Sequence, residues 1–130
     1  MIGAIRWVGQ KDECGCVAAC VAMLLGTDYR HASYMLRASG LVDAHAFIAW
    51  GTSFEAVFPL LKEAGWQRND DTPEVFLVDV WGGINGHTSL RHAVIAFPGG
   101  MVLDPGVEEW RDLRGYYHVG DALGLRRVLS

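Results

Sequence analysis

The sequence predicts an α+β domain in which N-terminal helices pack on a C-terminal antiparallel sheet. Two observations predict it: helical patterns fall between residues 16 and 66, and short β-branched and aromatic segments separated by Gly and Pro follow residue 70. Helices and strands that are segregated in this way indicate an α+β arrangement. No stretch is rich enough in Pro, Gly or Ser to be a linker, so residues 1–130 are expected to form a single domain.

Composition limits the classes of function. The chain is 51% hydrophobic and 20% charged, as in an ordinary globular protein, and 130 residues can bury a core without disulfides or metals. Its net charge of -4 disfavours a nucleic-acid backbone or an anionic membrane surface as partner. The longest apolar run, Cys16–Leu25, is too short to span a bilayer, and the first residues lack a signal-peptide pattern. We therefore expect a cytoplasmic protein.

The first part of the chain predicts one short strand and two helices. Residues 5–8 alternate like a strand, and residues 9–13 are polar and turn-like. Cys16–Leu25 is almost entirely apolar, which is typical of a helix buried on every side, and Gly26 is placed to end it. The second helix is expected within residues 29–40, capped by Thr27 or Asp28 and closed by the glycine at its end.

A third helix is predicted within residues 51–66. Thr52 or Ser53 is the expected N-cap, and Glu55 offers a reciprocal capping contact. Pro59 should kink this helix or mark its real beginning. One apolar face is predicted, made of Phe54, Val57, Phe58, Leu61 and Ala64.

Strands are expected at residues 74–82, 89–97, 101–104 and 115–119, and a turn of predictable type joins the second to the third. In Phe-Pro-Gly-Gly-Met, residues 97–101, a three-residue loop would place Pro98 and Gly99 in a type I turn and Gly100 in the left-handed position. Phe97 would then pair with the methionine, which puts His92 and Asp104 on the same sheet face as diagonal neighbours.

Three cysteines lie in one short segment, at spacings that fit neither a disulfide framework nor a paired zinc site. Cys16 lies in the first turn of the predicted helix, where free backbone N–H groups and the helix dipole favour a thiolate. Cys20, one turn deeper, is expected in the core and inert, whereas Cys14 lies in the preceding loop. A purely structural role in packing is the main alternative to a nucleophile. A zinc site made by the three thiols and a distant histidine such as His31 is a further alternative.

Gln10 precedes Cys16 by six residues and lies in the loop before the helix. Its side-chain amide is expected to reach the space beside the N–H of Cys16. Together these two donors would converge on a developing oxyanion, which acyl transfer through a cysteine requires.

The segment Q-K-D-E-C-G-C-V-A-A-C-V-A-M resembles the nucleophile segment of papain-like cysteine peptidases, most closely the bacteriocin-processing peptidases that cut after double-glycine leaders. The matching positions are Gln10, Cys16, Ala19, Cys20, Ala22 and Met23. The chain departs from that pattern at Val17, where the family has Gly, and at Gly15, where it has an acidic residue. Cys14 with the glycine after it is therefore an alternative nucleophile.

The resemblance also implies a histidine at the start of a strand and an Asp-Pro pair from the next strand. His92 and Asp104-Pro105 match that order. His87, in a glycine-rich loop, is the competitor, whereas the other histidines, His31, His45 and His118, are interpreted as surface or strand residues. Asp79 lies within an apolar strand, where it either faces solvent or needs a buried partner.

The resemblance thus implies a papain-like cysteine peptidase with Cys16 as nucleophile, His92 as general base and acid, Asp104 as the group that orients the histidine, and Gln10 as oxyanion donor. The expected substrate is a peptide or protein, with no metal or organic cofactor. A deamidase or acyltransferase using the same groups is one alternative. A non-catalytic peptide-binding module is another, although the complete set of four residues argues against it.

Overall fold

The structure is a computed structural model, and it describes residues 5–11, 16–40, 54–81, 91–108, 110–116 and 118–128. The helices described are α1 (Cys16–Leu25), α2 (Tyr29–Ala38), α3 (Phe54–Glu63) and the short 3-10 helix η2 (Leu113–Gly115). The strands are β1 (Trp66–Arg68), β2 (Val75–Trp81), β3 (Arg91–Ala96), β4 (Met101–Leu103), β5 (Trp110–Asp112) and β6 (His118–Arg127). They form one antiparallel sheet in the order β1-β6-β2-β3-β4-β5.

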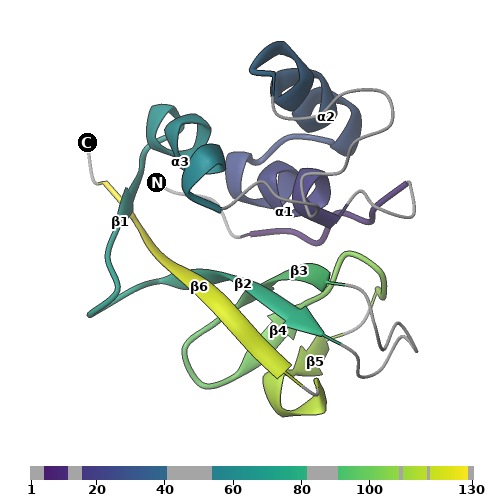
Figure 1. The fold of residues 1–130 in the computed structure, drawn as a ribbon, viewed down its shortest axis with the longest axis vertical. Coiled ribbons are helices and arrows are strands. Elements are labelled where there is room, and N and C mark those ends of the chain that lie inside the picture. Colours follow the sequence, from purple (N-terminus) through teal and green to yellow (C-terminus); the bar gives the residue numbers. More distant parts are fainter. Residues whose placement is uncertain are drawn as a thin grey trace.

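The three α-helices lie on one side of the sheet, as Figure 1 shows, and the predicted α+β arrangement is confirmed. Side chains alternate between the two faces of a strand. Leu77 and Ile95 therefore point to the helices and belong to the main core, whereas Val78 and Val94 belong to a second cluster on the opposite face. Tyr116, from the segment between η2 and β6, joins this second cluster.

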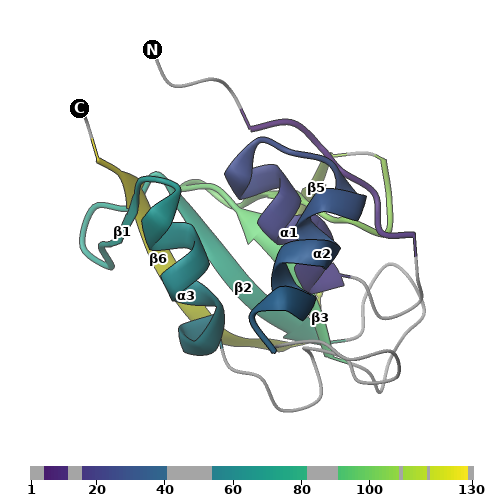
Figure 2. The same cartoon turned by 90° about the horizontal axis from the view of Figure 1, so that it is seen from above.

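Helix α1 is the centre of the main core. Its residues from Cys16 to Leu24 are all buried, as the continuous apolar run predicts, and it lies between the sheet and α2 (Figure 2). Gly26 follows the helix with φ +71°, a conformation that glycine adopts without a Cβ clash. Because the helix is packed on all sides, the residue at its N-terminus is held firmly in place.

Helices α2 and α3 begin and end close to the predicted positions. Asp28 caps α2 by accepting a 2.7 Å hydrogen bond from the backbone N–H of His31. Pro59 lies inside α3, which begins at Phe54, so the alternative that this proline starts the helix is wrong. Thr52 and Ser53 fall outside the described residues. On the predicted apolar face, Val57 and Leu61 are buried, Phe54 and Phe58 are partly buried, but Ala64 is exposed just beyond the helix end.

Several strand predictions need correction. Residues 5–8 form no strand, although Ile5, Trp7 and Val8 pack on the core. Strands β1 and β5 were not predicted, since three residues are too few for a periodic pattern. The expected strand at residues 115–119 begins only at His118 and continues to Arg127. Glycines at positions 120 and 124 interrupt its sequence pattern, but pairing with two neighbouring strands carries β6 through them.

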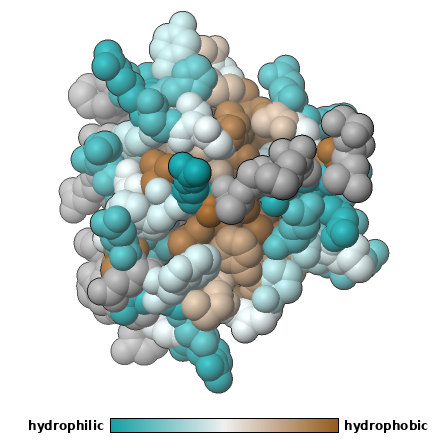
Figure 3. Space-filling view, turned by 180° about the vertical axis from the view of Figure 1, so that it is seen from behind, coloured by the Kyte–Doolittle hydropathy of each residue, from teal (hydrophilic) through white to brown (hydrophobic). Residues whose placement is uncertain are grey.

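Apolar surface gathers across the middle of the face seen in Figure 3, where the helical layer meets the sheet, and polar side chains surround it. In the part of the chain that the structure describes, the longest α-helix has ten residues, and none is long and apolar enough to cross a membrane.

The β3–β4 hairpin has the predicted register. Ile95 pairs with Leu103 and Ala96 pairs with Val102, while Phe97 donates a 2.8 Å backbone hydrogen bond to Met101. The turn type differs from the prediction, because Gly99 has φ +102° and Gly100 has φ +100°. A positive φ at Gly99 is typical of the third position of a type II turn, and the N–H of Gly100 donates to the carbonyl of Phe97 at 3.0 Å. The loop still contains three residues, so the register is unchanged.

Replacing Gly100 by valine should destabilise this hairpin. A β-branched residue at positive φ costs on the order of 1–3 kcal/mol. We expect a loss of that size in the free energy of unfolding, measured with urea, and a lower alkylation rate of Cys16 as Asp104 moves relative to His92. Gly120→Val is the control, because this exposed glycine of β6 has no positive φ, and it should cost less. Equal stability losses in the two variants would contradict the prediction.

Candidate functional site

His92 and Asp104 meet at one end of the neighbouring strands β3 and β4. His92 is the second residue of β3, and Asp104 directly follows β4. The Nε2 atom of His92 lies 2.6 Å from Oδ1 of Asp104, so the hairpin register brings the two side chains into contact as predicted. Cys16 is close enough to the ring for its side chain to help raise the pKa of His92. Since Nε2 is engaged by Asp104, Nδ1 is the nitrogen left for the thiol.

Cys16 is the first residue of α1 and is 3% exposed. Its side chain therefore lies where the first N–H groups of the helix have no partner within the helix. Cys20, one turn further along, is fully buried, and its thiol donates to the carbonyl of Ala93 at 3.5 Å. Burial, followed by the nearby charges of Cys16 and Asp104, raises the pKa of Cys20 well above its usual value. Cys20 therefore lies in the core, as the sequence predicts.

Asp104 is fully buried, and its carboxylate accepts hydrogen bonds from His92, Gly106 and Tyr116. Oδ1 receives the N–H of Gly106 at 2.8 Å in addition to the ring of His92. Oδ2 receives the hydroxyl of Tyr116 at 2.5 Å. Burial by itself would raise the pKa of Asp104, but the hydrogen bonds from His92, Tyr116 and Gly106, together with the charge of His92, lower it. The carboxylate is therefore ionised and fixed in orientation.

These contacts set the charge of the histidine. Burial by itself lowers the pKa of His92, but hydrogen bonds with Asp104 and Cys16 and their negative charges raise it to about 9. Burial and the hydrogen bond to Asp104 raise the pKa of Tyr116 above its usual range, so its hydroxyl keeps the proton that it donates. A protonated imidazole at neutral pH is what stabilises a neighbouring thiolate.

Gln10 lies beside the Asp104-Pro105 pair. Its backbone N–H donates to the carbonyl of Pro105 at 3.0 Å, and its side-chain amide oxygen is buried. The indole N–H of Trp7 donates to the carbonyl of Asp104 at 2.8 Å. Residues 5–11 therefore run along the strand end that carries the acid.

Sequence reasoning missed two residues that hold the site. Tyr116 and Trp7 contact Asp104 from positions 12 and 97 residues away in sequence. No local pattern marks either one, because each bond depends on how separate segments pack. A buried carboxylate needs hydrogen-bond donors, so the sequence indicates that Asp104 has partners, but it does not indicate which tyrosine or tryptophan they are.

The other candidate residues have varied outcomes. Asp79 is 5% exposed, so the solvent-facing alternative is wrong; it lies opposite Ala93, at an irregularity in the pairing of β2 with β6. His31 is exposed on α2, as expected.

Cys14, His45 and His87 lie outside the described residues, and the side chain of His118 is not described. Among the described side chains, no group of three His, Cys, Asp or Glu residues is arranged to hold a metal ion.

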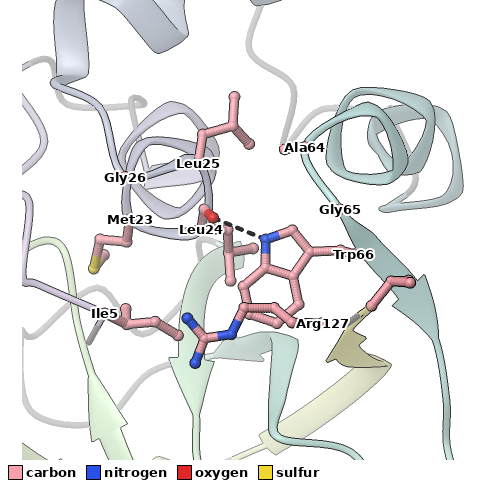
Figure 4. Close-up of a pocket in the computed structure, with 10 residues that line it drawn as sticks. Ile5, Met23, Leu24, Leu25, Gly26, Ala64, Gly65, Trp66 and Arg127 are labelled. Atoms are coloured by element: carbon pink, nitrogen blue, oxygen red, sulfur yellow. Dashed lines mark hydrogen bonds between the residues drawn. The ribbon is translucent and has the colours of Figure 1, made fainter. Parts of the chain in front are cut away.

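A separate cavity of about 240 Å³ lies at the other end of α1. It is lined by Met23, Leu24, Trp66 and Arg127, among others, and Figure 4 shows the indole N–H of Trp66 directed to the carbonyl of Leu24, at 2.8 Å. The guanidinium of Arg127 lies over the Trp66 ring, 5.1 Å from its centroid. A helix of ten residues is about 14 Å long between its terminal Cα atoms, so this cavity is distant from Cys16.

No model of a known protein family matches the chain, and no curated protein matches it. The interpretation of the site therefore depends on its own geometry.

Proposed function

We propose that the chain is a papain-like cysteine peptidase domain that cleaves a peptide bond in a peptide or protein substrate. The observation that carries the proposal is the hydrogen bond of 2.6 Å between His92 and the buried carboxylate of Asp104. Cys16, at the N-terminus of α1, lies near enough to this imidazole to help raise the pKa of His92. Nucleophile, base and orienting acid in this order are the arrangement of cysteine and serine hydrolases.

The reaction begins with attack of the Cys16 thiolate on the carbonyl carbon of the substrate. The negative charge that develops on the carbonyl oxygen is stabilised by the N–H of Cys16 and the side-chain amide of Gln10. The C–N bond then breaks, and His92 gives its proton to the leaving amine, which leaves a thioester on Cys16. A water molecule, deprotonated by the same ring, attacks the thioester, releases the acid and restores the thiolate and the imidazolium.

Asp104 has a supporting role in this scheme. Its carboxylate holds the ring in the tautomer that presents Nδ1 to the thiol and stabilises the positive charge of the imidazolium. No step requires a metal or an organic cofactor. The same groups would deamidate glutamine or transfer an acyl group to an amine, so the product identifies the reaction.

Alkylation with iodoacetamide tests the nucleophile, and the small size of this reagent suits a cysteine that is 3% exposed. Under this proposal, Cys16 is expected to react at pH 7 roughly tenfold faster than an ordinary exposed cysteine, which is only a few per cent thiolate at that pH. Peptide mapping by mass spectrometry should locate the label on Cys16. Cys20→Ala should keep the fast reaction, and Cys16→Ala should lose it. Fast labelling that persists in Cys16→Ala and maps to Cys14 would overturn the assignment.

A second experiment identifies the reaction. The protein is incubated with a complex pool of peptides, and new species are found by mass spectrometry. New peptide termini that are absent with Cys16→Ala support the peptidase. Conversion of Gln to Glu without cleavage would replace it by a deamidase, and the absence of any Cys16-dependent product together with slow alkylation would favour a binding module.

A further inference from the structure

Two hydrogen bonds attach the N-terminal segment to consecutive carbonyls of the strand end that carries the acid. Trp7 donates from its indole to the carbonyl of Asp104 at 2.8 Å, and Gln10 donates from its backbone to the carbonyl of Pro105 at 3.0 Å. The Trp7 ring also packs on the main core as a partly buried side chain. Residues 7–10 are therefore fixed at both ends.

Asp104 thus joins two parts of the candidate site. Its side chain holds His92 through Oδ1, while its backbone carbonyl holds Trp7. The carboxylate is itself restrained by Tyr116 and by the N–H of Gly106. Because Asp104 is held in this way, a segment that is hydrogen-bonded to its carbonyl, such as residues 7–10, is also held in place.

We propose that Trp7 is a positioning residue for Gln10: its indole N–H holds the segment that carries the oxyanion donor against the strand end that carries the acid. The inference rests on the proposed function, because it assumes that Gln10 binds the oxyanion. An oxyanion donor contributes about 10²–10³-fold to the rate only when it is held at hydrogen-bond distance from the developing charge. Loss of the Trp7 bond should therefore remove part of that contribution while the donor remains in the chain.

Two reactions of Cys16 distinguish the positioning of Gln10 by Trp7 from an effect of Trp7 on the Cys16 thiolate. Acyl transfer from p-nitrophenyl acetate passes through a tetrahedral oxyanion, whereas alkylation by iodoacetamide displaces iodide and forms no oxyanion. Both reactions depend on the thiolate. The ratio of the two rate constants therefore reports the oxyanion donor, and the alkylation rate alone reports the thiolate and the folded fraction.

Trp7→Phe keeps an aromatic ring and removes the N–H. We expect the ratio of acyl transfer to alkylation to fall about tenfold, which is less than the loss caused by Gln10→Ala. In the double variant Gln10→Ala/Trp7→Phe, the ratio should equal that of Gln10→Ala alone, because a positioning residue has no effect when the group that it positions is absent. Iodoacetamide alkylation should remain within twofold of the wild type.

Trp66→Phe is the matched control. Trp66 also donates its indole N–H to a main-chain carbonyl at 2.8 Å, that of Leu24 at the opposite end of α1 (Figure 4). This variant loses the same kind of bond far from Cys16, so its ratio should stay at the wild-type value. If Trp7→Phe fails to fold, β-(3-benzothienyl)alanine at position 7 keeps the bicyclic shape without the N–H, and the same fall in the ratio is expected.

Three results would overturn the inference. The first is an unchanged ratio in Trp7→Phe while Gln10→Ala lowers it, which would leave the proposed function intact. The second is an equal loss in both reactions, which would mean that Trp7 acts on the thiolate or on folding. The third is an additive loss in the double variant. An unchanged ratio in Gln10→Ala would instead remove the oxyanion role of Gln10 from the proposed function.

Discussion

Replacing His92 by alanine should lower the alkylation rate of Cys16 about 30-fold at pH 6.5. A cysteine with an unperturbed pKa of about 8.5 is only about 1% thiolate at that pH, but its thiolate is the more nucleophilic because its pKa is higher. Acyl transfer from p-nitrophenyl acetate should fall by about 10²–10⁴-fold, the usual contribution of a general base or acid. The cause is the loss of the imidazolium, whose pKa of about 9 keeps the positive charge next to the thiolate through the neutral range.

The loss of alkylation rate in His92→Ala should become smaller as the pH rises. The pKa of His92 in the folded protein lies above the unfolded value of about 6.5, so the protonated ring is favoured by folding. Its contribution to the free energy of unfolding is therefore fully present below about pH 6.5 and is lost as the pH rises through about 9. The alkylation rates of wild type and His92→Ala should accordingly converge above about pH 9.

His31→Ala is the control for this experiment, since His31 is an exposed histidine on α2. It should leave both reactions unchanged at every pH. An alkylation profile that is identical in wild type and His92→Ala would show that His92 does not stabilise the thiolate. In that case His87, the other histidine considered from the sequence, would be tested next.

The sequence predicts the hairpin well because its turn has a local cause. Only a loop of three residues places Phe97 opposite Met101, and the glycines at its end accept the positive φ that this loop needs. The turn type is less well determined, because with two consecutive glycines a positive φ is permitted at either one. The contact of His92 with Asp104 follows from the register and does not depend on the turn type.

Helix α1 is equally predictable, since ten successive apolar residues ended by Gly26 leave few alternatives. The short edge strands are not, because Trp66–Arg68 and Trp110–Asp112 become strands only through their pairing with β6 and β4. The same holds for the contacts of Tyr116 and Trp7 with Asp104, which join segments that are separate in the sequence. Local chemistry thus identifies Cys16, His92 and Asp104, whereas the residues that support them depend on tertiary packing.

Replacing Asp104 should produce a graded loss, and the geometry of its hydrogen bonds predicts the order. The two donors His92 and Gly106 both converge on Oδ1, whereas Oδ2 faces the hydroxyl of Tyr116. In Asp104→Asn, the amide oxygen can take the place of Oδ1 and keep both donors. The amide NH₂ then faces Tyr116, whose hydroxyl can rotate and accept. This variant should keep the orientation of the ring and lose only the negative charge.

Asp104→Ala removes the carboxylate that accepts from His92, Gly106 and Tyr116. It leaves the buried hydroxyl of Tyr116 without its partner, and an unpaired buried group costs about 1–3 kcal/mol. We therefore expect a loss of a few kcal/mol in the free energy of unfolding, against a smaller loss for Asp104→Asn. Tyr116→Phe removes a single donor and should lie between the wild type and Asp104→Ala in stability.

Alkylation of Cys16 measured against pH distinguishes charge from orientation at Asp104. Both substitutions remove the carboxylate that helps to raise the pKa of His92 to about 9, so the imidazolium should lose its proton at lower pH in each. The thiolate, which the imidazolium stabilises, should in turn form only at higher pH. At pH 6.5 the rate should fall in the order wild type, Asp104→Asn, Asp104→Ala and His92→Ala. A titration that does not move in Asp104→Ala would mean that another group holds the histidine, and Asp79, buried in the neighbouring strand opposite Ala93, would be the first to replace.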